Sequence, residues 1–307
     1  MTSYSLTAAA AGTWRLGDLT VNRIGFGAMR LTQNGAAFSN ERTPHDRDRA
    51  VAVLRRAVEL GVNHIDTAAF YFSPLRSANE LINRALGPYP DDLVITTKVG
   101  PGRGPCGDWT DWARPEQLRG QVQENIRQLG LDHLDVVNLR MNGNRSVADL
   151  FGALSELREE GLIRHLGLSN VWPEQITEAL GIAPVVCVQN PYGIGERRAD
   201  SREVMRMCGE LGIAFVPFYA IAGAGRESGT GAAEHETLLG IARAHDASPA
   251  QVRLAWTLQN GPHVLAIPGT GNPAHLEANV AAGALRLTDE EMARLTALGQ
   301  PAGADVA

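Results

Sequence analysis

The sequence predicts a (β/α)8 barrel, and three observations lead to that fold class. Short apolar strands alternate with amphipathic helices, which is the pattern of a parallel sheet covered by helices. Eight such units can be counted in the 307 residues, a length within the range of one large α/β barrel. No linker divides the alternation, so we expect a single domain over residues 1–307.

The first predicted element is a β-hairpin that precedes the barrel. Residues 13–25 read TWRLGDLTVNRIG and alternate around Gly17-Asp18, which is typical of a two-residue hairpin turn. We expect this hairpin to lie across the bottom of the barrel.

The eight units follow, each a strand and then a helix. The predicted strands cover residues 23–29, 63–68, 93–99, 134–140, 163–170, 185–190, 213–219 and 263–269. The predicted helices cover residues 46–60, 77–86, 114–129, 147–160, 173–180, 201–211, 234–245 and 273–282. Two extra helices are expected at 248–260 and after Thr288, because SPAQ and TDEE are capping-box signals. A doubly wound sheet is the alternative, but it normally has fewer units and a glycine-rich first turn, which GFGAM only half provides.

Composition narrows the classes of partner and compartment. A net charge of −6 provides no basic stripe for nucleic acid or an anionic membrane, so small metabolites are the expected partners. Cys106, Cys187 and Cys208 show no CxxC spacing, which argues against a disulfide framework or a zinc site. The first residues lack the basic region of a signal peptide, and no segment approaches the roughly 18 apolar residues of a membrane helix. We therefore expect a soluble, cytoplasmic protein.

Polar side chains gather where three consecutive strands end. Residues two apart on a strand point the same way, so Asp66, Lys98 and Arg140 are expected near one rim of the barrel, with Tyr71 in the loop that follows Asp66. The loops after the strands form the active face of such barrels. The sequence therefore predicts an acid, an amine, a guanidinium and a phenol in one site.

This cluster has the chemistry of a tuned acid. A phenol holds its proton tightly at neutral pH, but a nearby ammonium stabilises the phenolate, so we expect Lys98 to lower the pKa of Tyr71. A buried lysine keeps its charge only beside a carboxylate, a role that Asp66 can fill. Such a phenol suits protonation of a carbonyl oxygen while another group attacks the carbon.

At these residues the chain resembles the aldo-keto reductase family, over about residues 14–298. The ordered matches are GVNHIDTAAFY, ITTKVG, GLSN, VQNPY and IPGTGNPAHLEAN. The similarity is greatest to the bacterial pyridoxal reductase-like branch, in which strings such as LDVVNLR and VCVQN also occur. The resemblance implies a nicotinamide-dependent carbonyl reductase with Asp66, Tyr71 and Lys98 as catalytic residues.

The resemblance also implies how a nicotinamide cofactor would be held. Ser169, Asn170 and Gln189 are expected to bind the carboxamide, and Phe218 takes the position of the tyrosine that usually stacks on the ring. The expected adenosine site consists of Gly269, Thr270, His275 and Asn279, at the start of a helix whose free N–H groups suit an anion. NADP(H) is the preferred cofactor and NAD(H) is possible, because His275 stands where NADP-preferring members often have arginine.

The main departure from the family pattern is Arg140. It aligns with the histidine that usually completes an Asp/Tyr/Lys/His set. A guanidinium donates hydrogen bonds but does not shuttle a proton. Our hypothesis is that Tyr71 alone handles the proton, while Arg140 stabilises a developing alkoxide or holds an anionic group such as the phenolate of pyridoxal.

Each assignment has a structural alternative. Asp66 and Lys98 could be only an ion pair, and the GLSN residues Ser169 and Asn170 could be an ordinary turn. His64 could suggest a metal ligand, but without a second histidine we expect a core residue and no metal site. The glycine-rich runs GPGRGPCG and GAGRESGTG are interpreted as mobile loops over the barrel mouth. Trp109 and Trp112 are candidates for a pocket wall.

The sequence thus predicts a carbonyl reductase in which hydride reaches an aldehyde or ketone carbon while Tyr71 protonates the oxygen. By resemblance, pyridoxal to pyridoxine is the expected reaction. One alternative is reduction of a secondary-metabolite ketone or a sugar-derived aldehyde. Another is a cofactor-binding regulatory subunit with weak turnover, since the fourth catalytic position has changed.

Overall fold

The computed structural model describes residues 6–33, 46–104, 106–197, 200–221 and 235–298. Its central parallel sheet contains β3 Phe26–Gly27, β4 His64–Asp66, β7 Val94–Val99, β10 Leu134–Arg140, β11 Ile163–Ser169, β12 Val185–Gln189 and β15 Ala214–Phe215. The strands are hydrogen-bonded in this order, so each strand lies beside the one that precedes it in the barrel.

The predicted eighth strand is reduced to single backbone bridges. Val264 bridges to Phe215 of β15, and Ala266 bridges to Ile24, just before β3. The Phe215 N–H donates to the His263 carbonyl at 2.9 Å, and the Gly25 N–H donates to the Ala266 carbonyl at 2.8 Å. These bonds join the two edges of the sheet, so the predicted barrel is confirmed although its last strand is not continuous.

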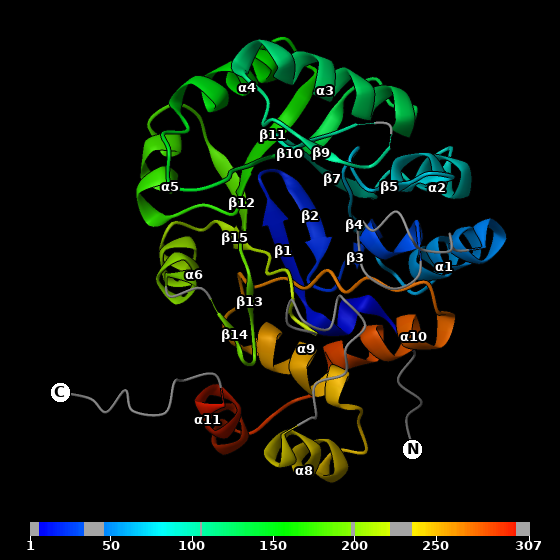
Figure 1. Ribbon diagram of the computed structural model, residues 1–307. Coiled ribbons are helices and arrows are strands. Elements are labelled where there is room, and N and C mark those ends of the chain that lie inside the picture. The colour runs from blue at the N-terminus through cyan, green and yellow to red at the C-terminus, as the bar shows by residue number, and fades with distance from the viewer. Residues whose placement is uncertain (1–5, 34–45, 105, 198–199, 222–234, 299–307) are drawn as a thin grey trace.

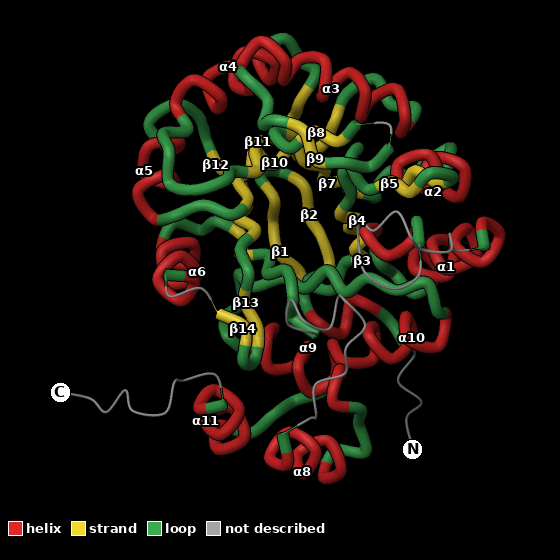
Figure 2. Tube along the Cα trace, viewed as in Figure 1, coloured by secondary structure: helices red, strands yellow, loops and turns green. Residues whose placement is uncertain are grey.

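Helices surround this barrel (Figures 1 and 2). They are α1 Arg47–Glu59, α2 Ala78–Leu86, α3 Pro115–Leu129, α4 Ala148–Glu159, α5 Pro173–Leu180, α6 Ser201–Glu210, α8 Glu236–Ala244, α9 Pro249–Gln259, α10 Pro273–Ala281 and α11 Asp289–Ala297. Short 3-10 turns are η1 Ala8–Ala11, η2 Ala28–Leu31 and η3 Ala282–Ala284. None of the described helices is both long enough and apolar enough to cross a bilayer.

Local sequence signals explain where the helices begin and end. The predicted capping boxes are present at Ser248 before α9 and at Thr288 before α11. Helix α3 starts with Pro115 and stops at Gly130, whose φ of 67° is left-handed and therefore suits glycine. The apolar faces of the helices pack on the strands in one large core that includes Phe26, Leu54 and Phe151.

The N-terminal hairpin is β1 Thr13–Leu16 paired with β2 Leu19–Asn22. Leu16 and Val21 pack in a second core with residues inside the barrel, including Val94 and Val136 near the starts of their strands. Figure 1 shows the hairpin lying across the end of the barrel, as predicted. The opposite end, where the strands finish, is therefore the one that is free to form a site.

Three small hairpins that were not predicted lie in the connections after strands. They pair β5 Phe72–Ser73 with β6 Arg76–Ser77, β8 Gly102–Arg103 with β9 Trp109–Thr110, and β13 Tyr192–Gly193 with β14 Glu196–Arg197. The GPGRGPCG run thus contributes a strand of a hairpin rather than an irregular loop. The GAGRESGTG run lies outside the described residues.

Candidate active site

A cavity of about 280 Å³ opens at the end of the barrel where the strands finish. Asp66 ends β4, Lys98 lies one residue before the end of β7, and Arg140 ends β10, so parallel register brings the three together. The side chains predicted for the site that line the cavity are Asp66, Tyr71, Lys98, Arg140, Gln189, Phe218 and Gly269. The predicted cluster therefore shares one cavity.

Lys98 and Asp66 form a buried ion pair. The Lys98 Nζ donates to Asp66 Oδ2 at 2.5 Å and to the Thr67 carbonyl at 3.1 Å. Burial alone would lower the pKa of Lys98, but the charge of Asp66 and the nearby Tyr71 outweigh it, so the pKa of Lys98 is raised. The ammonium is held charged, as predicted. Lys98 is also the only lysine in the sequence, since all the other basic residues are arginines.

Tyr71 lies beside this pair, with Lys98 Nζ 5.0 Å from the centre of its ring. Burial raises the pKa of the Tyr71 hydroxyl, and the charges of Lys98 and Arg140 oppose this only in part. Lys98 does lower the pKa of Tyr71, as expected, but burial raises it by more, so the net shift is upward. The reason is that the phenol is almost completely withdrawn from solvent, so a phenolate there loses more hydration than one ammonium restores.

Arg140 reaches across the cavity toward the next strands. Its Nη1 donates to Ser169 Oγ at 3.1 Å, and its Cζ lies 5.2 Å from the centre of the Phe218 ring. The distance to Phe218 is within the range of a cation–π contact. Arg140 therefore shares the cavity with Asp66 and Lys98 and contacts two of the residues predicted to hold a cofactor, Ser169 and Phe218.

Gln189, which is also predicted to hold the cofactor, contacts Asp66 directly. Its Nε2 donates to Asp66 Oδ1 at 2.5 Å, while its Oε1 is buried and has no partner among the described residues. A buried acceptor without a partner is costly, and an amide N–H of a bound nicotinamide is a donor of the kind it lacks. The residues present thus fit a carboxamide at this position.

Asn170, which is also predicted to hold the carboxamide, does not line the cavity. Its φ of 59° is left-handed, and its side-chain Nδ2 donates to the Met141 carbonyl at 3.0 Å. Its backbone N–H donates to the Gln189 carbonyl at 2.8 Å. Asn170 thus turns the chain at the end of β11, where Ser169 and Gln189 are paired neighbours in the β11–β12 ladder.

The residues predicted for the adenosine end lie before α10 and along it: Gly269 and Thr270 precede the helix, His275 is in its first turn and Asn279 near its end. Gly27 and Gly269 approach so closely that a Cβ on either would lie 2.5 Å from a backbone carbonyl oxygen of the other segment, Ile267 O or Gly27 O. Thr270 Oγ1 accepts from the Asn272 N–H at 3.0 Å, and Asn272 caps the helix. His275 is exposed and Asn279 is buried. The glycine pair therefore lets these two backbone segments pack against each other at the cavity edge.

The cavity wall contains residues that the sequence indicated only in part. Trp109 lines the cavity and Trp112 does not, and Met29, Arg30 and Phe70 line it without having been predicted. Arg103 ties the hairpin that carries Trp109 to the loop that carries Tyr71, because its Nη1 donates to the carbonyls of Phe70 and Phe72 at 3.0 and 2.8 Å. The signal for Arg30 was its place directly after the first strand.

His64 lies below Asp66 in the barrel interior. Its Nε2 lies 3.1 Å from Thr96 Oγ1, and its Nδ1 is buried without a partner among the described residues. Burial lowers the pKa of His64 to about 4, so the ring is neutral at physiological pH. Across the described residues no group of three or more histidine, cysteine, aspartate or glutamate side chains is arranged to hold a metal ion.

Comparison with known proteins shows the family to which the chain belongs. The family model for the aldo/keto reductases matches residues 23–300. The chain is 42% identical over 298 residues to pyridoxine 4-dehydrogenase of Escherichia coli strain K12, an alignment that covers 95% of this chain and 99% of that protein. It is 38% identical over 299 residues to an uncharacterized oxidoreductase of Schizosaccharomyces pombe, covering 97% and 93%.

Solved structures of aldo-keto reductases superpose on this chain. An aldo/keto reductase from Klebsiella pneumoniae in complex with NADP and acetate superposes with a TM-score of 0.75 at 27% identity, covering 94% of this chain and 96% of that one. A thermostable aldo-keto reductase in complex with the inhibitor epalrestat superposes with a TM-score of 0.76 at 27% identity, covering 94% and 99%. The chain belongs to the aldo/keto reductase family of oxidoreductases.

Proposed function

We propose that this protein reduces an aldehyde or ketone to an alcohol with NAD(P)H, with NADPH preferred and Tyr71 as the proton donor. The observation that carries the proposal is the buried Asp66–Lys98 pair beside Tyr71 in a cavity with access to the barrel mouth. Within one cavity, Lys98 supplies a positive charge, Asp66 supplies its counter-charge and Tyr71 supplies the acidic hydrogen. That combination serves protonation of a carbonyl oxygen.

The proton step follows from the charges in the cavity. The Tyr71 hydroxyl retains its proton at neutral pH and donates it to the substrate oxygen as negative charge develops there. The Lys98 ammonium stabilises the phenolate that remains, and Asp66 keeps that ammonium charged despite its burial. Arg140 adds a fixed positive charge beside the same oxygen and cannot compete for the proton.

The cofactor, when bound, supplies the hydride for the carbonyl carbon. Ser169, Asn170 and Gln189 would hold its carboxamide, of which Gln189 Oε1 is the acceptor still without a partner. Phe218 would pack on the ring, and Arg140 in turn packs on Phe218. The residues for the adenosine end are Gly269, Thr270, His275 and Asn279.

Pyridoxal is the substrate we propose, with pyridoxine as the product. The relative from Escherichia coli is named pyridoxine 4-dehydrogenase, which is the same interconversion read in the other direction. Two arginines, Arg30 and Arg140, line the cavity with the aromatic rings of Phe70 and Trp109. A small planar aldehyde with an ionised hydroxyl suits these cationic and aromatic walls, while Gln189, Phe218 and Gly269 of the same cavity are left to the cofactor. Its phenolate is the group assigned to Arg140.

The direct test is NADPH oxidation with pyridoxal, with product identified by chromatography. Pyridoxine formed in equal amount to NADPH consumed supports the proposal. Turnover of other ketones or sugar-derived aldehydes but not pyridoxal would favour a secondary-metabolite reductase. Tight NADPH binding without turnover over a broad aldehyde panel would favour a regulatory subunit and contradict the proposal. We further propose that residues 1–307 act as one domain in the cytoplasm, where NADPH is available.

A further inference from the structure

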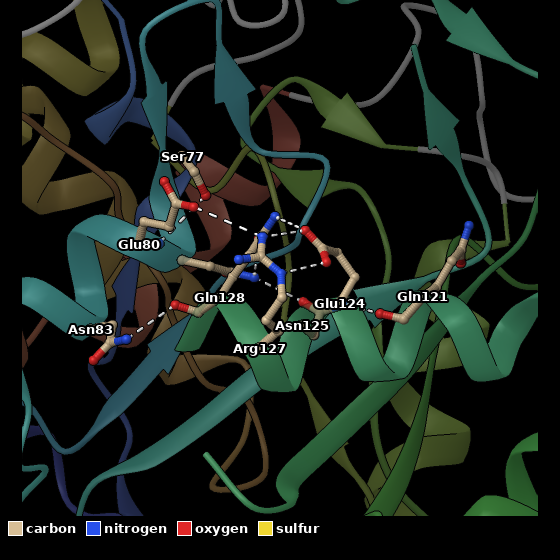
Figure 3. Close-up of polar contacts among 9 residues, drawn as sticks. Ser77, Glu80, Asn83, Gln121, Glu124, Asn125, Arg127 and Gln128 are labelled. Carbon is tan, nitrogen blue, oxygen red and sulfur yellow. Dashed lines mark hydrogen bonds and ion pairs between the residues drawn. The ribbon is translucent and has the colours of Figure 1, made fainter. Parts of the chain in front are cut away.

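Helix α3 turns amide side chains toward the barrel where apolar ones are usual. Gln121, Asn125 and Gln128 follow one another at helical spacing on this face, and Asn125 is completely buried. Figure 3 shows these residues along α3, where Asn125 Nδ2 donates to the Gln121 backbone carbonyl and Asn83 Nδ2 of α2 donates to the Gln128 backbone carbonyl. A buried amide that finds no partner costs about 1–3 kcal/mol, so a polar face at this place calls for a reason.

Asn125 belongs to a hydrogen-bonded chain of four residues. We call it the Thr–Asn–Asn–Thr chain, and its members are Thr67, Asn79, Asn125 and Thr97. Thr67 Oγ1 donates to Asn79 Oδ1 at 2.7 Å, and Asn79 Nδ2 donates to Asn125 Oδ1 at 2.9 Å. Thr97 Oγ1 donates to the same Asn125 oxygen at 2.6 Å. All four residues are 0% exposed, so bulk solvent does not compete for these hydrogen bonds.

Both ends of this chain adjoin the ion pair in the cavity. Thr67 follows Asp66 after β4, and Thr97 precedes Lys98 on β7. Side chains alternate along a strand, so the Thr97 hydroxyl faces the helices while Lys98 faces the barrel interior. Lys98 Nζ also donates to the Thr67 carbonyl. Covalent bonds, the four-residue chain and the ion pair therefore close a loop around Asp66 and Lys98.

The support continues into the helices. Asn125 Nδ2 donates to the Gln121 carbonyl at 2.9 Å, and Asn79 Nδ2 also lies 3.0 Å from Gln128 Oε1. Gln121 Oε1 accepts from the Gly100 N–H at 2.7 Å, just beyond the end of β7. Each amide is thus oriented by several partners, which fixes its direction as apolar packing would not.

We propose that Asn79 and Asn125 are positioning residues, which set the spacing of Asp66 and Lys98 through the two threonines. This inference rests on the proposed function, because the pair matters through Tyr71. Active-site groups must be held to roughly 0.5 Å, and a directional bond behind each strand end is a means of doing so. If the chain is broken, the ends of β4 and β7 can separate. Lys98 then loses part of the support from Asp66.

The test removes the Thr97 hydroxyl while keeping the shape of the side chain. Thr97→Val deletes the donor to Asn125, Thr97→Ser restores it, and Thr257→Val is the matched control, because Thr257 of α9 is also 0% exposed and its hydroxyl donates to a backbone carbonyl. In Thr97→Val we expect kcat for carbonyl reduction to fall on the order of 10-fold with little change in KM for NADPH. Thr97→Ser should recover most of the loss, and Thr257→Val should keep the wild-type kcat.

A second readout does not depend on turnover. Because Lys98 is the only lysine, protein labelled with ¹³C-lysine gives a single side-chain signal whose pH titration reports on that ammonium. We expect this titration to move to lower pH in Thr97→Val, and to remain in place in Thr97→Ser and Thr257→Val. An unmoved signal in a folded Thr97→Val protein would overturn the inference, as would an equal shift in the Thr257→Val control.

The two readouts also separate this inference from the proposed function. If the wild-type protein reduces no carbonyl, the proposed function fails, while the lysine titration still decides whether the Thr–Asn–Asn–Thr chain supports Lys98. If Thr97→Val folds poorly, the quadruple variant Thr67→Val, Asn79→Leu, Thr97→Val and Asn125→Leu replaces every member of the chain by an apolar group, which can preserve stability. A folded quadruple variant with wild-type kcat and Lys98 titration contradicts the positioning role.

Discussion

Arg140 donates a hydrogen bond to Ser169 across the ends of two adjacent strands, 3.1 Å from Nη1 to Oγ. By resemblance, Arg140 is expected to stand where the family usually has a histidine, and Ser169 is expected to hold the cofactor. The Arg140 guanidinium hydrogen-bonds Ser169 and packs on the Phe218 ring at the same time, and a guanidinium donates hydrogen bonds without shuttling a proton. The substitution therefore changes what the site can attract.

Arg140→Met should separate anionic from neutral substrates. We expect kcat/KM for pyridoxal to fall roughly 10- to 100-fold, since a hydrogen bond to a charged group contributes about 1.5–3 kcal/mol. A neutral aromatic aldehyde without an ionised hydroxyl should lose much less. Steady-state kinetics with both substrates are the measurement, and Arg140→His is the companion variant. Equal losses for both substrates in each variant would remove the anion-binding role.

Tyr71→Phe should abolish the proton transfer while keeping the ring. We expect hydride transfer in a single turnover to slow by roughly 10²- to 10⁴-fold, the range that a positioned general acid contributes. Binding of NADPH, measured by fluorescence, should stay within a factor of two or so of wild type, which controls for damage to the site. Hydride transfer at near wild-type rate would exclude Tyr71 as the acid.

The pH dependence of carbonyl reduction follows from the raised pKa values of Tyr71 and Lys98. Both groups must carry their protons, and each holds its proton to a higher pH than an ordinary tyrosine or lysine does. We therefore expect kcat to stay level from about pH 6 to about pH 9 and to fall only beyond that range. A fall centred near neutral pH would point to a different acid.

His64 should make the fold less stable in mild acid. Its pKa is about 4 in the folded protein and 6.5 ordinarily, so between these values the unfolded chain binds a proton that the folded chain refuses. The free energy of unfolding should then decrease as the pH falls from 6.5 to 4, by about 3 kcal/mol from this residue. Urea denaturation at a series of pH values measures it. In His64→Gln this dependence should be smaller. Identical curves for His64→Gln and wild type would be evidence against the buried neutral ring.

His275→Arg should strengthen the preference for NADPH. The side chain is exposed at the start of α10, so it can change without disturbing the core. A guanidinium binds a 2′-phosphate more strongly than a neutral imidazole, and we expect the affinity for NADPH to rise on the order of 10-fold. NADH, which lacks that phosphate, is the control and should bind as before. Paired titrations of both cofactors provide the measurement. A parallel gain for NADH would place His275 away from the 2′-phosphate.

The sequence by itself determined the parts that depend on local periodicity. Alternation along strands placed Asp66, Lys98 and Arg140 at one rim, and capping boxes gave the starts of α9 and α11. These patterns extend over only a few residues, so they can be recognised in the sequence without knowing what packs against them. The resemblance of the motifs to the aldo-keto reductases then pointed to the family that the comparisons confirm.

Tertiary structure decided what depends on burial and on register between distant strands. Gln189 meets Asp66 across 123 residues of chain, and Asn79 meets Asn125 across 46, so no local pattern indicates either bond. The direction of the Tyr71 pKa shift was also decided there, because desolvation depends on everything that surrounds the phenol. The eighth strand became single bridges for the same reason: whether an apolar segment forms a ladder is set by the neighbours it meets, not by its own sequence.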